Sequence, residues 1–145
     1  MTYLFDMSIE LVHKDQLKVY KELIEVCMKI ESVLMQPIEP DDPSSVERQL
    51  AERISYLGYT SRMMEQAIGI YDHVKGLAVD LILQSPVAEM KQSIQKNWFD
   101  GKLARYSALY ARVENLVKDL RNSIEGLRSI LSYEKELIRE QRLAV

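Results

Sequence analysis

The longest regular pattern in the chain is a row of apolar residues between Trp98 and about Arg142, spaced alternately by three and four positions. Such spacing predicts one long helix that packs along a neighbour over its whole length. At about 1.5 Å per residue this helix would extend roughly 65–70 Å. Apart from Glu134, the row is apolar or aromatic throughout: Phe99, Leu103, Tyr106, Tyr110, Val113, Val117, Leu120, Ile124, Leu127, Leu131 and Ile138.

Two further rows flank this seam. One broadens the apolar face and consists of Leu109, Leu116, Ser123, Ile130 and Leu137. The other begins at Glu114 and is then basic, with Arg121, Arg128, Lys135 and Arg142. A face of several apolar rows suits a three- or four-helix bundle better than a two-stranded coil.

A second long helix is predicted over residues 45–83. Ser44 and Glu47 have the spacing of a capping box at its start. Gly58 is a place where this helix could bend or restart. Its expected seam is Leu50, Ile54, Leu57, Ser61, Met64, Ile68, Tyr71, Lys75, Ala78 and Ile82.

The remaining segments complete an all-α fold in a single domain, residues 1–145. A first helix over about 9–35 is followed by a proline-rich loop, 36–43. Ser85 and Pro86 begin a short helix of about 87–96, and Asn97 or Asp100 then caps the long helix, 98–142. We therefore predict an elongated antiparallel helical bundle, or long helical hairpin, with three long helices and one short helix.

The charge balance, the cysteine content and the lengths of the apolar runs restrict the surroundings in which the protein is expected to act. The chain has 19 basic and 22 acidic residues, a formal net charge of −3, which argues against coating nucleic acid or anionic lipid with the whole surface. Cys27 is the only cysteine, so no intramolecular disulfide is expected. No apolar run approaches the roughly 20 residues of a membrane span. We expect a cytoplasmic protein that does not associate with membranes.

The sequence offers no convincing set of catalytic residues. Glu10 and His13 have the ExxH spacing of di-iron bundles, but such a site needs a second pair. His73, the only other histidine, has no glutamate at that spacing. Nucleotide-binding loops, HExxH and the nucleophile elbow are absent from the sequence. We predict a protein without catalytic residues, metal or cofactor.

One candidate interaction surface lies beyond the reach of the first helix. Short connections make consecutive helices antiparallel, so the first helix covers the second only to about Tyr71. Residues 1–7, the short helix or a second subunit could cover the apolar side chains that lie beyond. We expect a homo-oligomer, most simply a two-fold dimer, to bury them. They are Leu77, Leu81, Ile82, Trp98, Phe99, Tyr106 and Tyr110.

A second candidate surface is the basic row of the last helix, Arg121, Arg128, Lys135 and Arg142. Basic side chains at regular exposed intervals can contact phosphates, and nearby tyrosines can stack on bases. The same basic side chains could instead pair with Glu22, Glu25, Glu52 or Glu65, or face water. Tyrosines at helical spacing are also typical of a bundle core.

The segment NWFDGKLARYSALYARVENL and the following IEGLRSILSYEKEL resemble small uncharacterised helical proteins of bacterial phages and integrated mobile elements. The resemblance implies no catalytic residues; it suggests an association with DNA replication and recombination. We predict a non-catalytic bundle that acts through protein–protein interaction with a partner of unknown identity. The alternative is an accessory factor of replication or recombination that binds single-stranded DNA.

Overall fold

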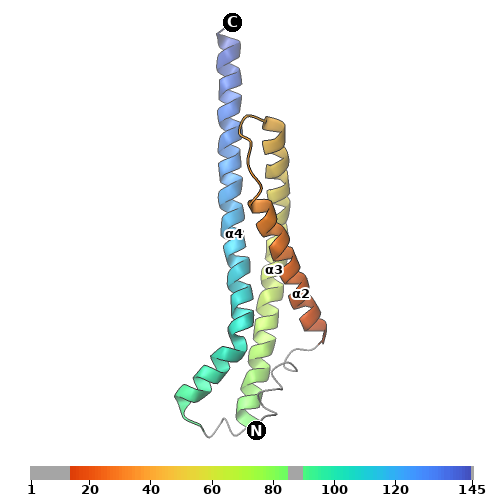
Figure 1. Cartoon of the computed structure of the whole chain (residues 1–145), viewed down its shortest axis with the longest axis vertical. Coiled ribbons are helices and arrows are strands. Elements are labelled where there is room, and N and C mark those ends of the chain that lie inside the picture. Colours follow the sequence, from red (N-terminus) through yellow and green to blue (C-terminus); the bar gives the residue numbers. More distant parts are fainter. Residues whose placement is uncertain (1–13, 85–89, 145) are drawn as a thin grey trace.

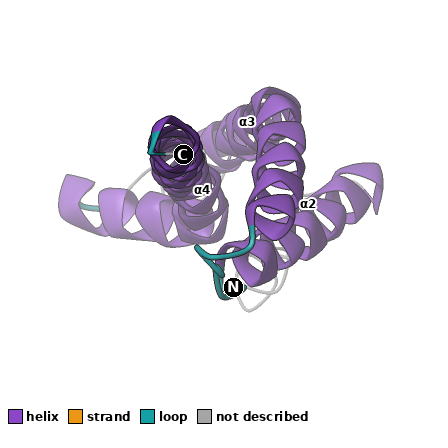
Figure 2. Cartoon of the chain, turned by 90° about the horizontal axis from the view of Figure 1, so that it is seen from above, coloured by secondary structure: helices purple, strands orange, loops and turns teal. Residues whose placement is uncertain are grey.

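The computed structural model describes residues 14–84 and 90–144, and these form three helices joined by short connections. Helix α2 spans Lys14–Leu34, α3 spans Pro43–Gln84 and α4 spans Gln92–Leu143. Helices α3 and α4 lie side by side as a long antiparallel hairpin, and α2 packs against both (Figures 1 and 2). The all-helical prediction is confirmed, since the described residues contain no strand.

Helix α3 begins two residues before the predicted start. The Asp42 carboxylate oxygen Oδ1 accepts a hydrogen bond from the Ser45 N–H at 3.2 Å, and Pro43 occupies the first helical position. Asp42 is therefore the N-cap, and the predicted capping box with Ser44 as N-cap is wrong. Proline suits the first position because its N–H would have no helical partner there. The helix continues unbroken through Gly58.

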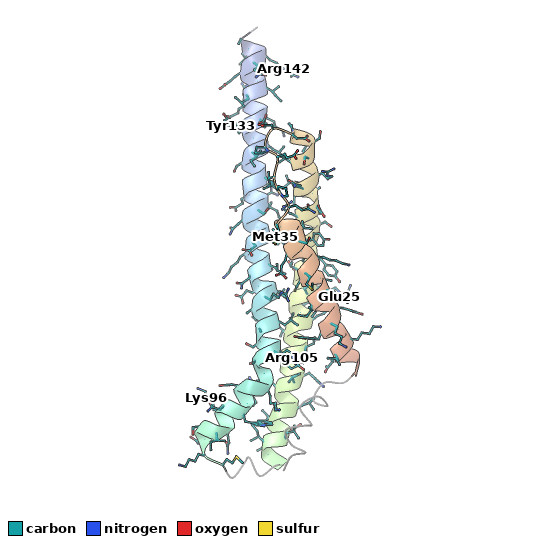
Figure 3. The ribbon with its side chains drawn as sticks, in the orientation of Figure 1. Glu25, Met35, Lys96, Arg105, Tyr133 and Arg142 are labelled. Atoms are coloured by element: carbon teal, nitrogen blue, oxygen red, sulfur yellow. The ribbon has the colours of Figure 1, made fainter. Side chains whose placement is uncertain are left out.

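Helix α4 differs from the expected pair of helices. It is unbroken from Gln92 to Leu143, so the predicted separate helix over 87–96 is wrong and neither Asn97 nor Asp100 caps a helix. Residues 87–89 lie outside the described residues. The first turns of α4, which carry Lys96, run at an angle to the rest, and the bend lies near Arg105 (Figure 3). Residues 9–13 of the predicted first helix also lie outside the described ranges.

The core lies where the three helices meet. Leu23, Cys27 and Ile30 of α2 are buried there between α3 and α4, and the ring of Tyr20 contacts that of Tyr106 edge to face. The predicted α4 seam is confirmed in part, because the following members are buried: Leu103, Tyr106, Val113, Leu120, Ile124 and Leu127. Tyr110 and Val117 are only half-buried, whereas Leu109 and Leu116 of the predicted flank are buried. None of the described helices has a stretch long and apolar enough to cross a membrane.

The buried row of α3 lies one residue earlier than the predicted seam. Its members are Arg53, Thr60, Met63, Ala67, Ile70 and Val74. Ile54 and Ile68 of the predicted seam are 43% and 42% exposed. One residue corresponds to about 100° around a helix, so the predicted seam faces a different side of α3. Apart from Ala78, which is 0% exposed, the prediction of this seam was wrong, because α3 carries two adjacent apolar rows and packing places only one against its neighbours.

Candidate functional site

The predicted seam of α3 lines an uncovered groove between α3 and α4. One hollow, of about 300 Å³, is lined by Ile68, Tyr71, Ser107 and Tyr110. The next one along the interface, of about 470 Å³, is lined by Leu57, Thr60, Ser61, Met64, Glu114, Val117 and Arg121. We call these eleven residues together the open groove.

Helix α2 lies on the other side of the hairpin. Arg112 of α4 donates from Nε to the Glu31 carboxylate of α2 at 2.9 Å, and Nη2 of the same arginine contacts that oxygen as well. Asn115 and Asp119 of α4 line the same side as Arg112, beside the end of α2. Figure 2 shows α2 on one side of the α3–α4 pair. The open groove is therefore the side of the hairpin that no described helix covers.

The floor of the open groove is mainly apolar. Leu57, Met64, Tyr71 and Tyr110 are half-buried, while Ile68 is exposed. The hydroxyl of Thr60 donates to the Leu57 carbonyl at 2.6 Å, so its proton is already used within α3. Charged groups lie only near one end, on Glu114 and Arg121. Such a lining fits an apolar helix face rather than a small polar substrate.

The predicted basic row runs along the edge of α4 that borders the open groove. Arg121 lines the groove, and Arg128, Lys135 and Arg142 continue at seven-residue intervals towards the end of the helix (Figure 3 labels Arg142). All four side chains are exposed. Within the described ranges none of them forms an ion pair or hydrogen bond, so they face water and do not pair with acidic residues of the neighbouring helices.

The residues of the predicted oligomer surface are divided between core and surface. Tyr106 is only 7% exposed and belongs to the core, and Phe99 packs against that core. Tyr110 lines the open groove. The other four residues are half-buried: Leu77, Leu81, Ile82 and Trp98.

Other side chains supply the exposed apolar surface at this end of the hairpin. Val79, Leu83 and Ile94 are 41%, 72% and 48% exposed. The sequence pattern missed them because they lie outside the heptad rows. Residues 1–7, which were considered as a lid, lie outside the described residues.

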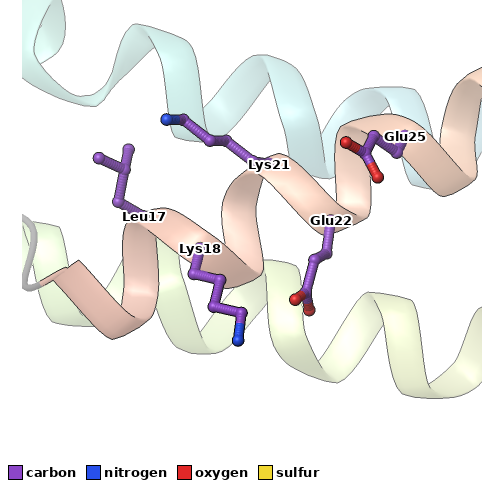
Figure 4. A pocket seen from close by; sticks show the side chains of 5 residues that line it. All are labelled: Leu17, Lys18, Lys21, Glu22 and Glu25. Atoms are coloured by element: carbon purple, nitrogen blue, oxygen red, sulfur yellow. The ribbon is translucent and has the colours of Figure 1, made fainter.

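A third hollow, of about 460 Å³, lies on α2 and is lined by Leu17, Lys18, Lys21, Glu22 and Glu25. All five residues come from one helix. Figure 4 shows the side chains of Lys18 and Glu22 pointing to one side of α2 and that of Lys21 to the other. Because these charged groups diverge, they cannot converge on one ligand, and this hollow is a solvated helix surface.

The buried polar groups have structural roles. The Arg53 guanidinium donates from Nη2 to the Val33 carbonyl at 2.9 Å and from Nη1 to the Gln49 carbonyl at 3.2 Å. Val33 lies in the last turn of α2, where carbonyls have no partner within the helix. Burial raises the pKa of the Cys27 thiol, although the Arg112 guanidinium lowers it in part. A thiol in this setting is a poor nucleophile.

Within residues 14–84 and 90–144, no group of three His, Cys, Asp or Glu side chains could hold a metal ion. The Glu10–His13 pair lies outside these ranges. Comparison with protein-family models, curated proteins and solved structures found no match. The resemblance to phage and mobile-element proteins, like the cytoplasmic location, therefore stays a prediction from the sequence.

Proposed function

We propose that this protein is a non-catalytic helical bundle that acts by binding a helix of another protein in the open groove. The observation that supports this function is the rotation of α3. Its buried row packs against α2 and α4, and the neighbouring apolar row, with Leu57, Met64, Ile68 and Tyr71, lines the uncovered groove. A helix with a wide apolar face usually packs on more than one side, and no described helix covers the second row of α3.

The dimensions of the open groove suit a helix. From Leu57 to Tyr71 the groove follows about 21 Å of α3, or roughly four helical turns. Helices that bind in grooves insert apolar side chains three, four and seven positions apart, and this spacing matches the lining of the two successive hollows. An occupant would complete a four-helix arrangement, in which α2 and the partner lie on opposite sides of the α3–α4 hairpin.

Site-specific crosslinking tests this function. A photoreactive amino acid placed at Ile68, in the open groove, should give a crosslinked adduct when the full chain is expressed in its own host. The matched control carries the same group at Met28, which is 59% exposed on α2, away from the groove. An adduct at Ile68 and none at Met28 is the expected result. Equal labelling at both positions, or none at Ile68, would contradict the proposal.

A further inference from the structure

We propose that the occupant of the open groove is a long amphipathic helix with acidic residues along one flank, which continues past the groove along the projecting end of α4. This inference rests on the proposed function and adds the length and charge of the partner. Three observations lead to it: apolar residues that recur on one side of α4 both in the groove and beyond it, an uncovered helix end, and a basic row without carboxylate partners among the described residues.

The apolar line has members in the open groove and others towards the end of α4. Tyr110, Val117, Ile124, Leu131 and Ile138 follow one another at seven-residue intervals and so lie along one side of the helix, with only a slow drift around it. Tyr110 and Val117 line the groove. Leu131 is half-buried and Ile138 is 44% exposed. Ile124, which lies between them, is only 4% exposed. The wall of the groove and the apolar stripe beyond it therefore lie on the same side of α4 and are separated by one buried position.

The last part of α4 has no helical neighbour in the described structure. Leu127 is its last buried residue. Figure 1 shows α4 running past the ends of α2 and α3, and Figure 3 places Tyr133 beside their connection and Arg142 well beyond it. The heptad pattern nevertheless continues to Ile138, with Ile130 and Leu137 beside the line. Apolar side chains exposed to water in such a row are unfavourable, and a partner helix would bury them.

The basic row defines the charge of the partner. Arg121, Arg128 and Lys135 flank the apolar line at the positions where charged residues in coiled coils select the partner. Among the described residues no carboxylate pairs with any of them. A helix lying on the apolar line would place one of its own flanks beside this row. Acidic residues on that flank would satisfy three basic side chains that the described part of the chain leaves unpaired.

A second copy of α4 does not supply this complement. Two copies packed antiparallel along the apolar line would bring basic row against basic row, and like charges there oppose association. Two parallel copies would bring the basic row beside the opposite flank. That flank offers no carboxylate, since it consists of Leu109, Leu116, Ser123, Ile130 and Leu137.

Single-stranded nucleic acid would contact the basic row of α4 but would not cover the apolar line beside it. Its phosphates could contact the basic row, but its bases need aromatic faces on which to stack. Tyr71 and Tyr110 are confined to one end of the open groove, whereas the apolar line beyond it is aliphatic, with Leu131 and Ile138. A protein helix covers both the aliphatic line and the charged row.

Two designed peptides test the charge of the occupant. Each has about 28 residues, enough to span the roughly 42 Å from Tyr110 to Ile138, with leucine at the two core positions of each heptad. One carries glutamate at both flanking positions, the other lysine. Fluorescence anisotropy with the full chain should show the acidic peptide binding about tenfold more tightly at low salt, as expected for a few exposed charge pairs. The difference should shrink as salt screens the charges.

Charge reversal provides the decisive variants. The triple variant Arg121→Glu, Arg128→Glu, Lys135→Glu should prefer the basic peptide. The matched control reverses three exposed lysines of α2, with Lys18→Glu, Lys21→Glu and Lys29→Glu, and should keep the acidic preference. Circular dichroism verifies that both variants keep the helical content of the wild type. A wild type that binds neither peptide, or both equally, would overturn the inference, as would a triple variant that still prefers the acidic peptide.

Ile68→Asp separates this inference from the proposed function. Weaker binding of both peptides by this variant supports the groove as the site. If binding depends on the basic row but not on Ile68, the acidic partner is supported and the groove is not. If binding depends on Ile68 but not on charge, the groove is supported and the acidic partner is wrong. A thymidine oligonucleotide that binds more tightly than the acidic peptide, and is lost in the triple variant, would assign the basic row to nucleic acid instead.

Discussion

Among individual residues, Arg53 is the side chain least expected from its type. Arginine is seldom fully buried without an acidic partner, yet Arg53 is 0% exposed and bonds only to backbone carbonyls, those of Val33 and Gln49. The Gln49 amide, in turn, donates to the Pro37 carbonyl at 3.0 Å. The two side chains thus hold the end of α2 and the following connection against α3. A cation near the carbonyl end of a helix is also favourable for its dipole.

We predict that Arg53→Met lowers the free energy of unfolding by about 1–3 kcal/mol, because it removes the two hydrogen bonds of the guanidinium to the carbonyls of Val33 and Gln49. The Val33 carbonyl would keep only its bond from the Gln36 N–H, at 3.2 Å. Urea unfolding followed by circular dichroism measures the change. Arg48→Met is the matched control, since Arg48 is exposed on the same helix and its replacement should cost less than about 0.5 kcal/mol. Equal stability of Arg53→Met and wild type would show that these hydrogen bonds do not stabilise the fold.

A second prediction at this scale concerns alkaline pH. Burial raises the pKa of Cys27 and of Tyr106 above their ordinary values. Above about pH 8.5 the unfolded chain therefore loses protons that the folded chain still holds, and the free energy of unfolding falls as pH rises. Cys27→Ala lacks the contribution of the thiol. Its free energy of unfolding should therefore fall less steeply than that of the wild type between about pH 8 and about pH 9.5. The measurement is the urea midpoint of unfolding as a function of pH for both proteins. Equal slopes for wild type and variant would contradict the prediction.

Periodicity in the sequence identifies the apolar core residues, but not the buried polar ones. Leu120 and Leu127 were expected in the seam of α4, and both are fully buried. Asp42 before Pro43 is a local N-cap signature that the sequence contains, although the predicted N-cap is Ser44. Arg53 was missed because its role depends on the path of the chain between α2 and α3. Val33 offers its carbonyl to Arg53 only after that connection has folded. Hydrophobic spacing contains no information about such backbone partners.

Among the helices, α3 and α4 show when a heptad pattern is sufficient to predict a buried face. On α4 one flank is basic and the other apolar, which restricts the face that packs inside. The buried face is turned towards the apolar flank, since Leu109 and Leu116 are buried while Tyr110 and Val117 are half-buried. On α3 the apolar residues at Met63 and Met64, or at Ile70 and Tyr71, are neighbours in sequence. Either row could have been the core, and only packing against α2 and α4 selects one. The open groove could not be predicted for this reason.

A pair of substitutions tests the rotation of α3. Leu120→Asp places a charge at a fully buried position and should lower the free energy of unfolding by several kcal/mol, enough to unfold or dissociate the bundle. Ile68→Asp changes a similar aliphatic residue that is 42% exposed, and should cost about 1 kcal/mol or less. Thermal melts by circular dichroism compare the two. Similar losses in both variants would mean that the predicted seam, and not the row one residue earlier, is buried.

At the scale of the whole molecule, the described helices form a hairpin with one face covered by α2 and one face open (Figures 1 and 2). Exposed apolar side chains also lie near the end of α3, on Val79 and Leu83, and in the first turns of α4, on Ile94. This end is separate from the projecting end of α4. One copy can therefore contact a second copy at one end while it binds a different helix in the open groove.

The last prediction is that the protein forms a dimer through the end of the hairpin that carries these side chains. Leu83 is 72% exposed and Ile94 is 48% exposed, whereas Phe99 packs against the core. Replacing Leu83 and Ile94 by serine should therefore remove apolar contact area without disturbing the bundle. Light scattering should give a dimeric mass for the wild type and a monomeric mass for the double variant. In a two-fold interface each residue occurs on both sides, so each substitution removes two apolar side chains from the contact.

The matched control for the dimer is Met28→Ser with Met35→Ser, which removes two exposed apolar side chains, 59% and 83% exposed, at the other side of the molecule. It should remain dimeric. A wild type that stays monomeric at high micromolar concentration would contradict the dimer. If the methionine control dissociates and the Leu83→Ser, Ile94→Ser variant does not, the subunits instead meet through the exposed side of α2, because only that contact depends on the two methionines.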